Sequence, residues 1–222
     1  MTGKLIAMIP ARLGSQRLKK KNLALLNGEP LIAHAIRKCF AANCFDEVWV
    51  NSESEEIAAV ARAEGANFHE RPIELANNVA TSEDFVGEFF RNHECEAMVQ
   101  VHSIAPLLTA GEVRGFVETY NKNEYDVLLS CIDDQIEVAF EGMPVNFTFA
   151  EKTNSQDLKP MQRITWSITA WRRSMFLDAL SQKKTATYYG RVGFYPVSPT
   201  SGHVIKTQRD LEIAAALMNI AD

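Results

Sequence analysis

Residues 5 to 17 read Leu5-Ile6-Ala7-Met8-Ile9-Pro10-Ala11-Arg12-Leu13-Gly14-Ser15-Gln16-Arg17, a short apolar run followed directly by a basic loop that contains a glycine. An apolar run of this length, without polar alternation, is typical of a strand that is buried on both faces of a sheet. In open α/β sheets, ligands bind beyond the carboxyl ends of such strands. The stretch therefore predicts an α/β sheet with a ligand-binding loop after its first strand.

Strand-like and helix-like segments alternate through the next 120 or so residues, as expected of βα units. Apolar strand patterns occupy residues 5–10, 47–51, 66–69, 96–102 and 126–132. Amphipathic helix patterns occupy residues 30–42, 54–63, 81–92 and 110–121. This order predicts one α/β domain over residues 1–222, with a doubly wound, mainly parallel sheet and helices on both faces.

The pattern changes after Cys131. Two β segments surround Glu141-Gly142, a polar stretch follows at 151–162, and residues 164–171 alternate as a strand. We therefore expect a β insertion at about 133–170, acting as a lid or as a dimerisation arm. Beyond it, the patterns predict a helix over 172–180, a strand over 188–197 and a closing helix over 207–220.

The composition is that of an ordinary globular domain: 222 residues, 46% hydrophobic and 23% charged, with a formal net charge of −5. The mild acidity disfavours a nucleic-acid binder, which normally carries a basic face. No segment approaches the roughly 18–20 apolar residues of a membrane helix, so no membrane partner is expected. The four cysteines have no metal-ligand spacing, which favours a reduced, cytoplasmic protein.

A local run of basic residues contrasts with the negative net charge of the chain. It contains no acid and comprises Arg12, Arg17, Lys19, Lys20 and Lys21. Gly14 permits a tight turn and close approach to a ligand, and successive amides in such a turn form a concave anion site. Arginine offers a phosphate two donors, and lysine offers a mobile point charge. A triphosphate site is one interpretation and a solvated surface loop is the other, because neither a Walker motif nor a dinucleotide fingerprint is present.

The opening motif closely resembles that of cytidylyltransferases. It reads Ile9-Pro10-Ala11-Arg12-x-Gly14-Ser15-x-Arg17, with Lys21-Asn22 beyond it. The resemblance is to the sialic-acid-type and Kdo-type CMP-sugar synthetases, which activate nine- and eight-carbon 2-keto acids. It implies a Rossmann-like α/β fold, CTP as donor, pyrophosphate as product and Mg²⁺ as cofactor. Weaker similarities continue at Glu70-Arg71-Pro72, Thr81-Ser82, Gln156-Asp157-Leu158-x-Pro160 and Asp210-Leu211-Glu212-Ile213-Ala214.

The resemblance also assigns roles to particular residues. It makes Arg12 and Lys21 catalytic, because they would stabilise charge during transfer. The nucleotide site that it implies comprises Ala11, Arg12, Gly14, Ser15, Lys21, Asn22, Arg71 and Ser82. Gln100 and Arg163 are the sugar-binding candidates, since an arginine suits the carboxylate of a small acidic sugar. A homodimer is implied as well.

Three departures from the family pattern fall on the metal and sugar sides. The family closes with an Asp-x-Asp before its last helix, and Val204 and Lys206 occupy those positions here. Ile104 stands at the position where Kdo-type enzymes have a metal-binding aspartate. Where the family often has Glu-Asn-Gly, this chain has Arg163-Ile164-Thr165-Trp166-Ser167. Magnesium prefers hard oxygen ligands, so the metal ligands are not identified.

These departures leave three alternatives open. Lys206 would replace part of the metal's charge, or the triphosphate and water would hold the metal, or the protein would bind without catalysing. The function hypotheses are accordingly a CMP-sugar synthetase, a catalytically impaired nucleotide-binding homologue with a regulatory role, and a nucleotidyltransferase for another sugar or nucleotide.

Several other polar residues are expected to be structural. Asp210 follows Thr207 by three positions, as in a helix-capping pair, and Asp133-Asp134 suits a turn better than a metal site. His102 and His203 are each interpreted as either a structural hydrogen-bonding group or a residue of the cleft.

Overall fold

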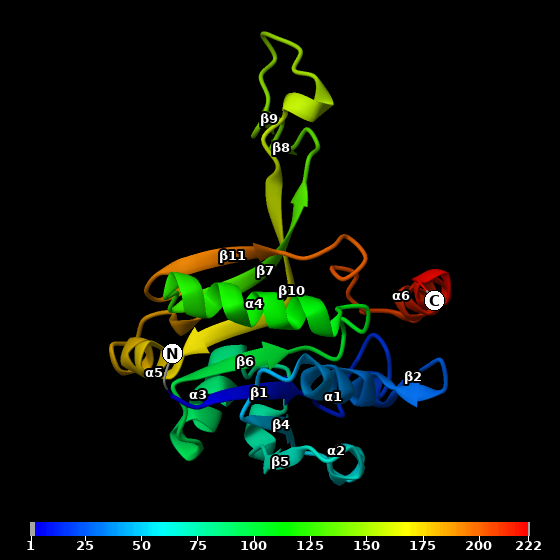
Figure 1. The fold of residues 1–222 in the computed structure, drawn as a ribbon, viewed down its shortest axis with the longest axis vertical. Coiled ribbons are helices and arrows are strands. Elements are labelled where there is room, and N and C mark those ends of the chain that lie inside the picture. Colours follow the sequence, from blue (N-terminus) through cyan, green and yellow to red (C-terminus); the bar gives the residue numbers. More distant parts are fainter. Residues whose placement is uncertain (1–2, 222) are drawn as a thin grey trace.

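A seven-stranded sheet forms the centre of the computed structural model, which describes residues 3–221 (Figure 1). The strand order is β11-β7-β10-β6-β1-β4-β5. The strands are β1 (Leu5–Pro10), β4 (Glu47–Ser52), β5 (Asn67–Glu70), β6 (Ala97–Val101), β7 (Val127–Asp134), β10 (Met161–Arg172) and β11 (Val192–Pro196). Two short hairpins pair β2 (Leu25–Leu26) with β3 (Glu29–Pro30), and β8 (Ala139–Phe140) with β9 (Met143–Pro144).

Helices cover both faces of the sheet, as the doubly wound prediction requires. The α-helices are α1 (Leu31–Ala42), α2 (Glu55–Ala63), α3 (Ser82–Asn92), α4 (Ala110–Asn123), α5 (Arg173–Ser181) and α6 (Gln208–Ala221). Four 3₁₀ turns lie at Lys21–Leu23, Ile73–Leu75, Ser155–Asp157 and Ala186–Tyr188. None of the helices described is long and apolar enough to cross a membrane.

The position of β1 inside the sheet explains why its sequence is continuously apolar. Successive side chains of a strand point to opposite faces, so Ala7 and Ile9 pack under α1, α2 and α4, whereas Ile6 and Met8 pack against α3 and α5. All four of these side chains are fully buried. Burial on both faces leaves no polar position in the strand, which confirms the prediction of a mainly parallel α/β sheet.

The strand β10 departs from the parallel pattern. It runs antiparallel to both of its neighbours, with Ile168 opposite Val101 of β6 and Thr169 opposite Leu129 of β7. The sequence pattern placed this strand inside the insertion, but its second half is a central strand of the sheet. A β-bulge between Ile164 and Thr169 separates that half from the first, which continues out of the sheet.

The segment between β7 and β10 projects as an arm from one end of the sheet (Figure 1). Its stem pairs Met161 with Asp134 and Ile164 with Cys131, and the β8–β9 hairpin lies beyond the stem. Much of the arm's apolar surface is exposed, including Phe140 at 68% and Phe149 at 73%. The arm is shorter than the predicted β insertion because the second half of β10 belongs to the sheet. Its exposed apolar side chains are not covered by the rest of the described chain.

Candidate functional site

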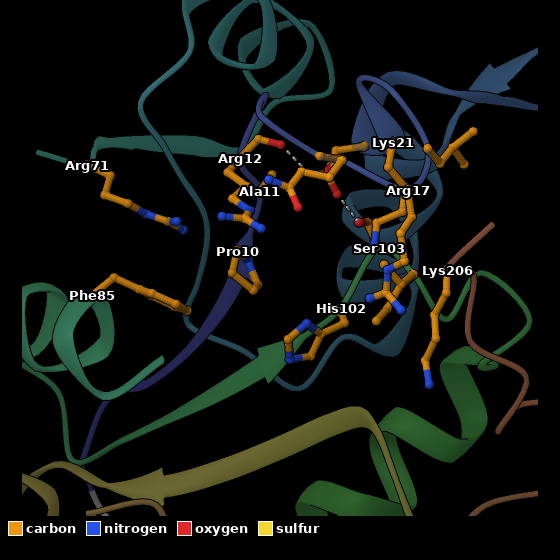
Figure 2. Close-up of a pocket in the computed structure, with 15 residues that line it drawn as sticks. Pro10, Ala11, Arg12, Arg17, Lys21, Arg71, Phe85, His102, Ser103 and Lys206 are labelled. Atoms are coloured by element: carbon orange, nitrogen blue, oxygen red, sulfur yellow. Dashed lines mark hydrogen bonds between the residues drawn. The ribbon is translucent and has the colours of Figure 1, made fainter. Parts of the chain in front are cut away.

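A cavity of about 390 Å³ lies at the carboxyl ends of β1 and β6 (Figure 2). Its volume is in the range of small-molecule ligand pockets. The residues that line it are Pro10, Ala11, Arg12, Ser15, Gln16, Arg17, Leu18, Lys21, Asn22, Arg71, Phe85, His102, Ser103, Ile104 and Lys206. The set joins the glycine-containing loop to residues far along the chain, as expected for a site beyond parallel strands.

The loop after β1 is held by a few directed hydrogen bonds. The backbone N–H of Ala11 donates to Asn51 O at 3.0 Å, and that of Leu13 donates to Glu53 Oε1 at 2.8 Å. The side-chain amide of Asn22, which is buried, donates to Arg12 O at 2.8 Å and accepts from Ser103 Oγ at 2.6 Å. Asn22 thereby ties the loop to the end of β6, so the structure gives it a positioning contact within the protein.

Five cations line the cavity, and none of the described lining residues is an aspartate or a glutamate. They are Arg12, Arg17, Lys21, Arg71 and Lys206. Burial lowers the pKa of Lys21 below its ordinary value, and the charges of Arg17, Arg12 and Lys206 lower it further. Uncompensated charge of one sign in a cleft favours an anionic ligand.

The cavity has two distinct ends (Figure 2). Arg71 and Phe85 lie at one end, and Arg17, Lys21 and Lys206 lie at the other. The guanidinium of Arg71 lies 4.3 Å from the centroid of the Phe85 ring, a cation–π contact. A planar, delocalised cation with free donors at one end and clustered cations at the other would suit a ligand with a flat polar group and an anionic tail.

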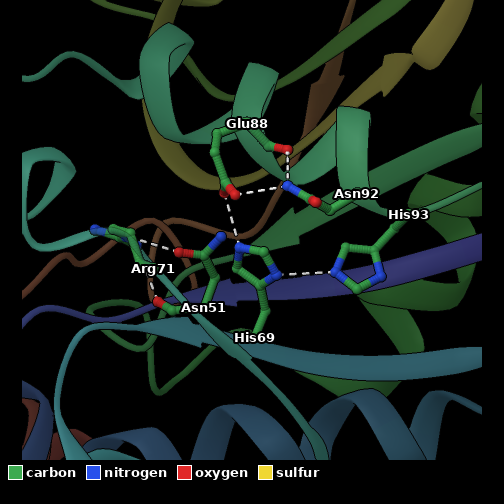
Figure 3. Close-up of polar contacts among 6 residues, drawn as sticks. All are labelled: Asn51, His69, Arg71, Glu88, Asn92 and His93. Atoms are coloured by element: carbon green, nitrogen blue, oxygen red, sulfur yellow. Dashed lines mark hydrogen bonds and ion pairs between the residues drawn. The ribbon is translucent and has the colours of Figure 1, made fainter.

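Arg71 is buried and fixed from behind by Asn51 of β4 (Figure 3). Its Nε donates to Asn51 Oδ1 at 2.5 Å, and its Nη2 donates to Asn51 O at 2.9 Å. Burial lowers its pKa to about 10, so it is charged at neutral pH. In the neighbouring cluster His69 contacts Glu88 at 2.7 Å and His93 at 2.9 Å, and burial followed by the charge of His69 lowers the pKa of His93 to about 4.

His102 lines the cavity, whereas Gln100, two residues earlier, does not. His102 Nε2 lies 2.9 Å from Gln100 Oε1, and burial together with the nearby charge of Lys21 lowers the pKa of His102 to about 4. His102 is therefore neutral at pH 7. Gln100 is 1% exposed, and its Nε2 has no partner among the residues of the structure described.

The structure brings together most, but not all, of the expected nucleotide and sugar residues. Ala11, Arg12, Ser15, Lys21, Asn22 and Arg71 line the cavity. Gly14 faces a separate hollow beside Glu53, and Ser82 is exposed in the first turn of α3. A Cβ at Gly14 would meet nothing within 4 Å, so the fold itself does not require glycine there.

Arg163 lies in a neighbouring cavity of about 290 Å³. That cavity is also lined by His203, Val204 and Lys206, so Lys206 belongs to both cavities. Arg163 Nε forms an ion pair with Asp134 Oδ2 at 2.6 Å. An acidic ligand in this second cavity would therefore compete with Asp134 for Arg163.

The residues at the expected metal positions do not fit Mg²⁺. Ile104 and Lys206 both line the cavity, and neither side chain offers an oxygen. Asp210 Oδ2 accepts from the backbone N–H groups of Lys206 and Thr207 and from Thr207 Oγ1, so it caps α6 as the sequence predicts. Within residues 3–221, no three His, Cys, Asp or Glu residues are grouped to hold a metal ion.

The sequence does not mark Phe85 as a residue of the site, whereas Lys206 is one of its alternatives for replacing the metal's charge. Phe85 of α3 packs partly against the core and also stacks under Arg71. His203, whose role was left open, has Nε2 at 2.9 Å from Asp210 O and supports the start of α6. No local signal in the sequence marks Phe85, because the contact joins two separate segments, the loop after β5 and α3, at one end of the cavity.

Comparison with known sequences yields a family match over nearly the whole chain. The family described as Cytidylyltransferase matches residues 6–218. The chain is 37% identical over 127 residues to N-acylneuraminate cytidylyltransferase A of Danio rerio, covering 57% of this chain and 30% of that one. It is 27% identical over 193 residues to N-acylneuraminate cytidylyltransferase of Streptococcus agalactiae serotype V, covering 82% of this chain and 47% of that one. The chain thus spans less than half the length of these curated relatives.

Comparison with solved structures supports the fold. A CMP:2-keto-3-deoxy-manno-octonic acid synthetase, solved in complex with CTP, superimposes with a TM-score of 0.75 and 19% sequence identity. The match covers 99% of this chain and 100% of that one. At this identity the likeness concerns the α/β architecture alone.

Proposed function

This chain belongs to the cytidylyltransferase family, and from that premise we propose that it transfers a cytidylyl group from CTP to a 2-keto sugar acid. The anomeric hydroxyl oxygen of the acid attacks the α-phosphorus of CTP and forms a new P–O bond. The bond between the α-phosphorus and the bridging oxygen breaks, pyrophosphate leaves, and the hydroxyl proton is released. The product is a CMP-sugar of the sialic-acid-like or Kdo-like class.

The observation that carries this proposal is the cavity with five cations and no carboxylate beyond the end of β1. Arg12 and Lys21 are assigned to the phosphates, where they stabilise the charge that develops on the oxygens during transfer. Ala11 and Ser15 supply backbone and hydroxyl groups around them, and Gly14, which faces the neighbouring hollow, is assigned only to the turn of the loop. Positioning and electrostatic stabilisation account for most of the catalysis of such a transfer, so these groups are suited to it.

Base selection is assigned to the other end of the cavity. Arg71 is held by Asn51 and lies on Phe85, so its remaining donors are oriented toward the cleft. Cytosine presents a carbonyl and a ring nitrogen that can accept such donors. Asn22 is assigned an indirect role, through the loop that it ties to Ser103. Ser82 does not line the cavity, so its assignment to the base rests on the family resemblance alone.

The acceptor sugar is assigned to the side of the cleft where the second cavity adjoins the first. Lys206 is common to both cavities, which would place a sugar carboxylate near Arg163 and its hydroxyl near the phosphates. Gln100 is assigned an indirect role, because it contacts His102, which lines the first cavity.

Pyrophosphate release tests the proposal directly. The protein is incubated with CTP and a panel of sialic-acid-like and Kdo-like acids, and we expect release with at least one of them. The Arg12→Ala variant should bind CTP more weakly by about tenfold or more, the value of a charge-assisted hydrogen bond. CTP binding that survives this substitution unchanged would contradict the phosphate assignment.

A second candidate function is nucleotide binding without turnover, and Ile104 and Lys206 at the metal positions favour it. Measurable CTP binding without pyrophosphate release from any acid would establish it over the transferase. Turnover with a different nucleotide or acceptor would instead establish a nucleotidyltransferase of another specificity.

A homodimer formed through the arm is part of the proposal. The arm exposes Ile136, Phe140, Met143, Val145 and Phe149, a cluster of large apolar side chains of the kind that marks an interaction surface. Light scattering should give twice the mass of the chain, and Phe140→Asp should give the monomer. We place the protein in the cytoplasm, where its four free cysteines would stay reduced.

A further inference from the structure

The five cations of the cavity are gathered in one cleft and form no ion pair with an acidic side chain among the described residues. Ion pairs elsewhere neutralise Lys20 with Glu56, Arg37 with Glu64 and Arg163 with Asp134. Across the part of the chain that the structure describes, no ion pair involves any of the five cavity cations, which are Arg12, Arg17, Lys21, Arg71 and Lys206. An unpaired cluster is costly through mutual repulsion, and the lowered pKa of Lys21 reflects that repulsion together with burial.

Two hydrogen bonds, donated by the backbone N–H groups of Ile205 and Lys206, hold Lys206 at the cavity. The N–H of Ile205, which is fully buried, donates to Ile104 O at 2.8 Å. The N–H of Lys206 itself donates to Asp210 Oδ2 at 2.9 Å. The segment before α6 is therefore fixed against the end of β6, and Lys206 lines the cavity on the side where Arg17 and Lys21 lie (Figure 2).

Asp210, four positions after Lys206, serves as the cap of α6. Its Oδ2 accepts three hydrogen bonds, from Lys206 N, Thr207 N and Thr207 Oγ1. An ion that took Oδ2 would remove this cap, and Asp210 lines the second cavity rather than this one. The described lining of the first cavity offers no carboxylate, so a divalent ion there would face cations rather than oxygen ligands.

We propose that Lys206, with Arg17 and Lys21, binds the nucleotide triphosphate directly in place of a protein-held divalent ion, so that nucleotide affinity does not depend on Mg²⁺. The proposal rests on the assignment of this cavity to a nucleotide. An ammonium is a compact point charge that can approach phosphate oxygens without ordered coordination. It supplies the neutralisation that a carboxylate-held ion would provide elsewhere, and it requires no ligand that this cavity lacks.

Calorimetric titration with two probes tests the inference. CTP and inorganic triphosphate are titrated into the protein in EDTA and again in Mg²⁺. We expect CTP to bind in EDTA with a dissociation constant within about threefold of that in Mg²⁺. Lys206→Ala should weaken both probes in EDTA by about tenfold or more, because one charge-assisted contact is lost.

Two variants serve as controls for this titration. Arg209→Ala removes the same charge three positions along the chain, from an exposed residue that does not line the cavity, and should change both affinities less than about twofold. Lys206→Asp should abolish most binding in EDTA and recover part of it in Mg²⁺, because the new carboxylate can hold the ion. Lys206 is exposed, so these variants should keep the melting temperature of the parent.

The outcomes separate this inference from the proposed function. Binding of CTP that requires Mg²⁺, or that is unaffected by Lys206→Ala, would overturn the inference and leave the transferase proposal standing. Binding of inorganic triphosphate in EDTA without any CTP binding would support the cationic site and overturn the cytidylyltransferase assignment. Failure of both probes under both conditions would overturn both.

Discussion

Replacing Asn22 with alanine should loosen the loop that carries Arg12 and Ser15. The buried Asn22 amide makes two hydrogen bonds, to Arg12 O at 2.8 Å and from Ser103 Oγ at 2.6 Å. Each bond contributes about 1 kcal/mol net, and leaving the buried Ser103 hydroxyl without its partner costs about 1 kcal/mol more. We therefore expect Asn22→Ala to lower the free energy of unfolding by about 3 kcal/mol.

Thermal unfolding measures this loss. For a chain of this size, about 3 kcal/mol corresponds to a fall of roughly 6–12 °C in melting temperature. Ser103→Ala is the matched control: it removes only one of the two bonds and should cost about 1–2 kcal/mol. Because the two residues share a bond, the double variant should lose less than the sum of the single losses.

Nucleotide binding gives a second measurement on the same variants. The loop would still be present in Asn22→Ala but would no longer be tied to the end of β6, so CTP affinity should fall by about tenfold or more. A melting temperature and a CTP affinity both equal to those of the parent would refute the reasoning. They would show that the loop is held by its remaining backbone contacts alone.

Three further perturbations test separate parts of the site. Arg71→Lys removes the two hydrogen bonds to Asn51. Calorimetry should show the affinity for CTP falling by about tenfold and the affinity for inorganic triphosphate changing less than about twofold; equal losses of the two affinities would place Arg71 on the phosphates. The pKa of Lys21 is lowered, so this lysine loses its charge at a lower pH than an arginine at the same position would. As the pH rises, triphosphate affinity should therefore begin to fall earlier in the parent than in Lys21→Arg; superimposable profiles would exclude Lys21 as the titrating group. His93 has a folded pKa of about 4, below its unfolded value, so the unfolded state binds more protons between pH 6.5 and 4; the free energy of unfolding should therefore fall on acidification through that window, by at most about 3 kcal/mol, and denaturant titrations of His93→Phe should lack that fall.

The parallel part of the fold could be predicted because its signals are local. The apolar run at Leu5–Pro10 is continuous because both faces of β1 are buried, and the helix patterns mark which side of each helix packs. The antiparallel placement of β10 could not be predicted in this way. It depends on pairing Ile168 with Val101 of β6, two residues far apart in the chain, and alternation alone does not choose a strand's neighbours.

The candidate site was predictable where one segment supplied it and less so where distant segments meet. Arg12 and Lys21 lie within a single loop, and the structure places both at the cavity with Arg71. Phe85 has the helical spacing of a packed residue, so the sequence does not distinguish it from the core side chains of α3. The sequence offers Lys206 as one possible replacement for the metal's charge, but its place in the cavity depends on long-range contacts such as the backbone bond between Ile205 and Ile104.

The most direct test of the central claim is a crystal structure of the chain with CTP bound. We predict the triphosphate against Arg12, Lys21 and Lys206, and the cytosine ring at the end of the cavity formed by Arg71 and Phe85. Electron density for CTP outside this cavity, or with the ring and the phosphates at opposite ends from those stated, would contradict the account.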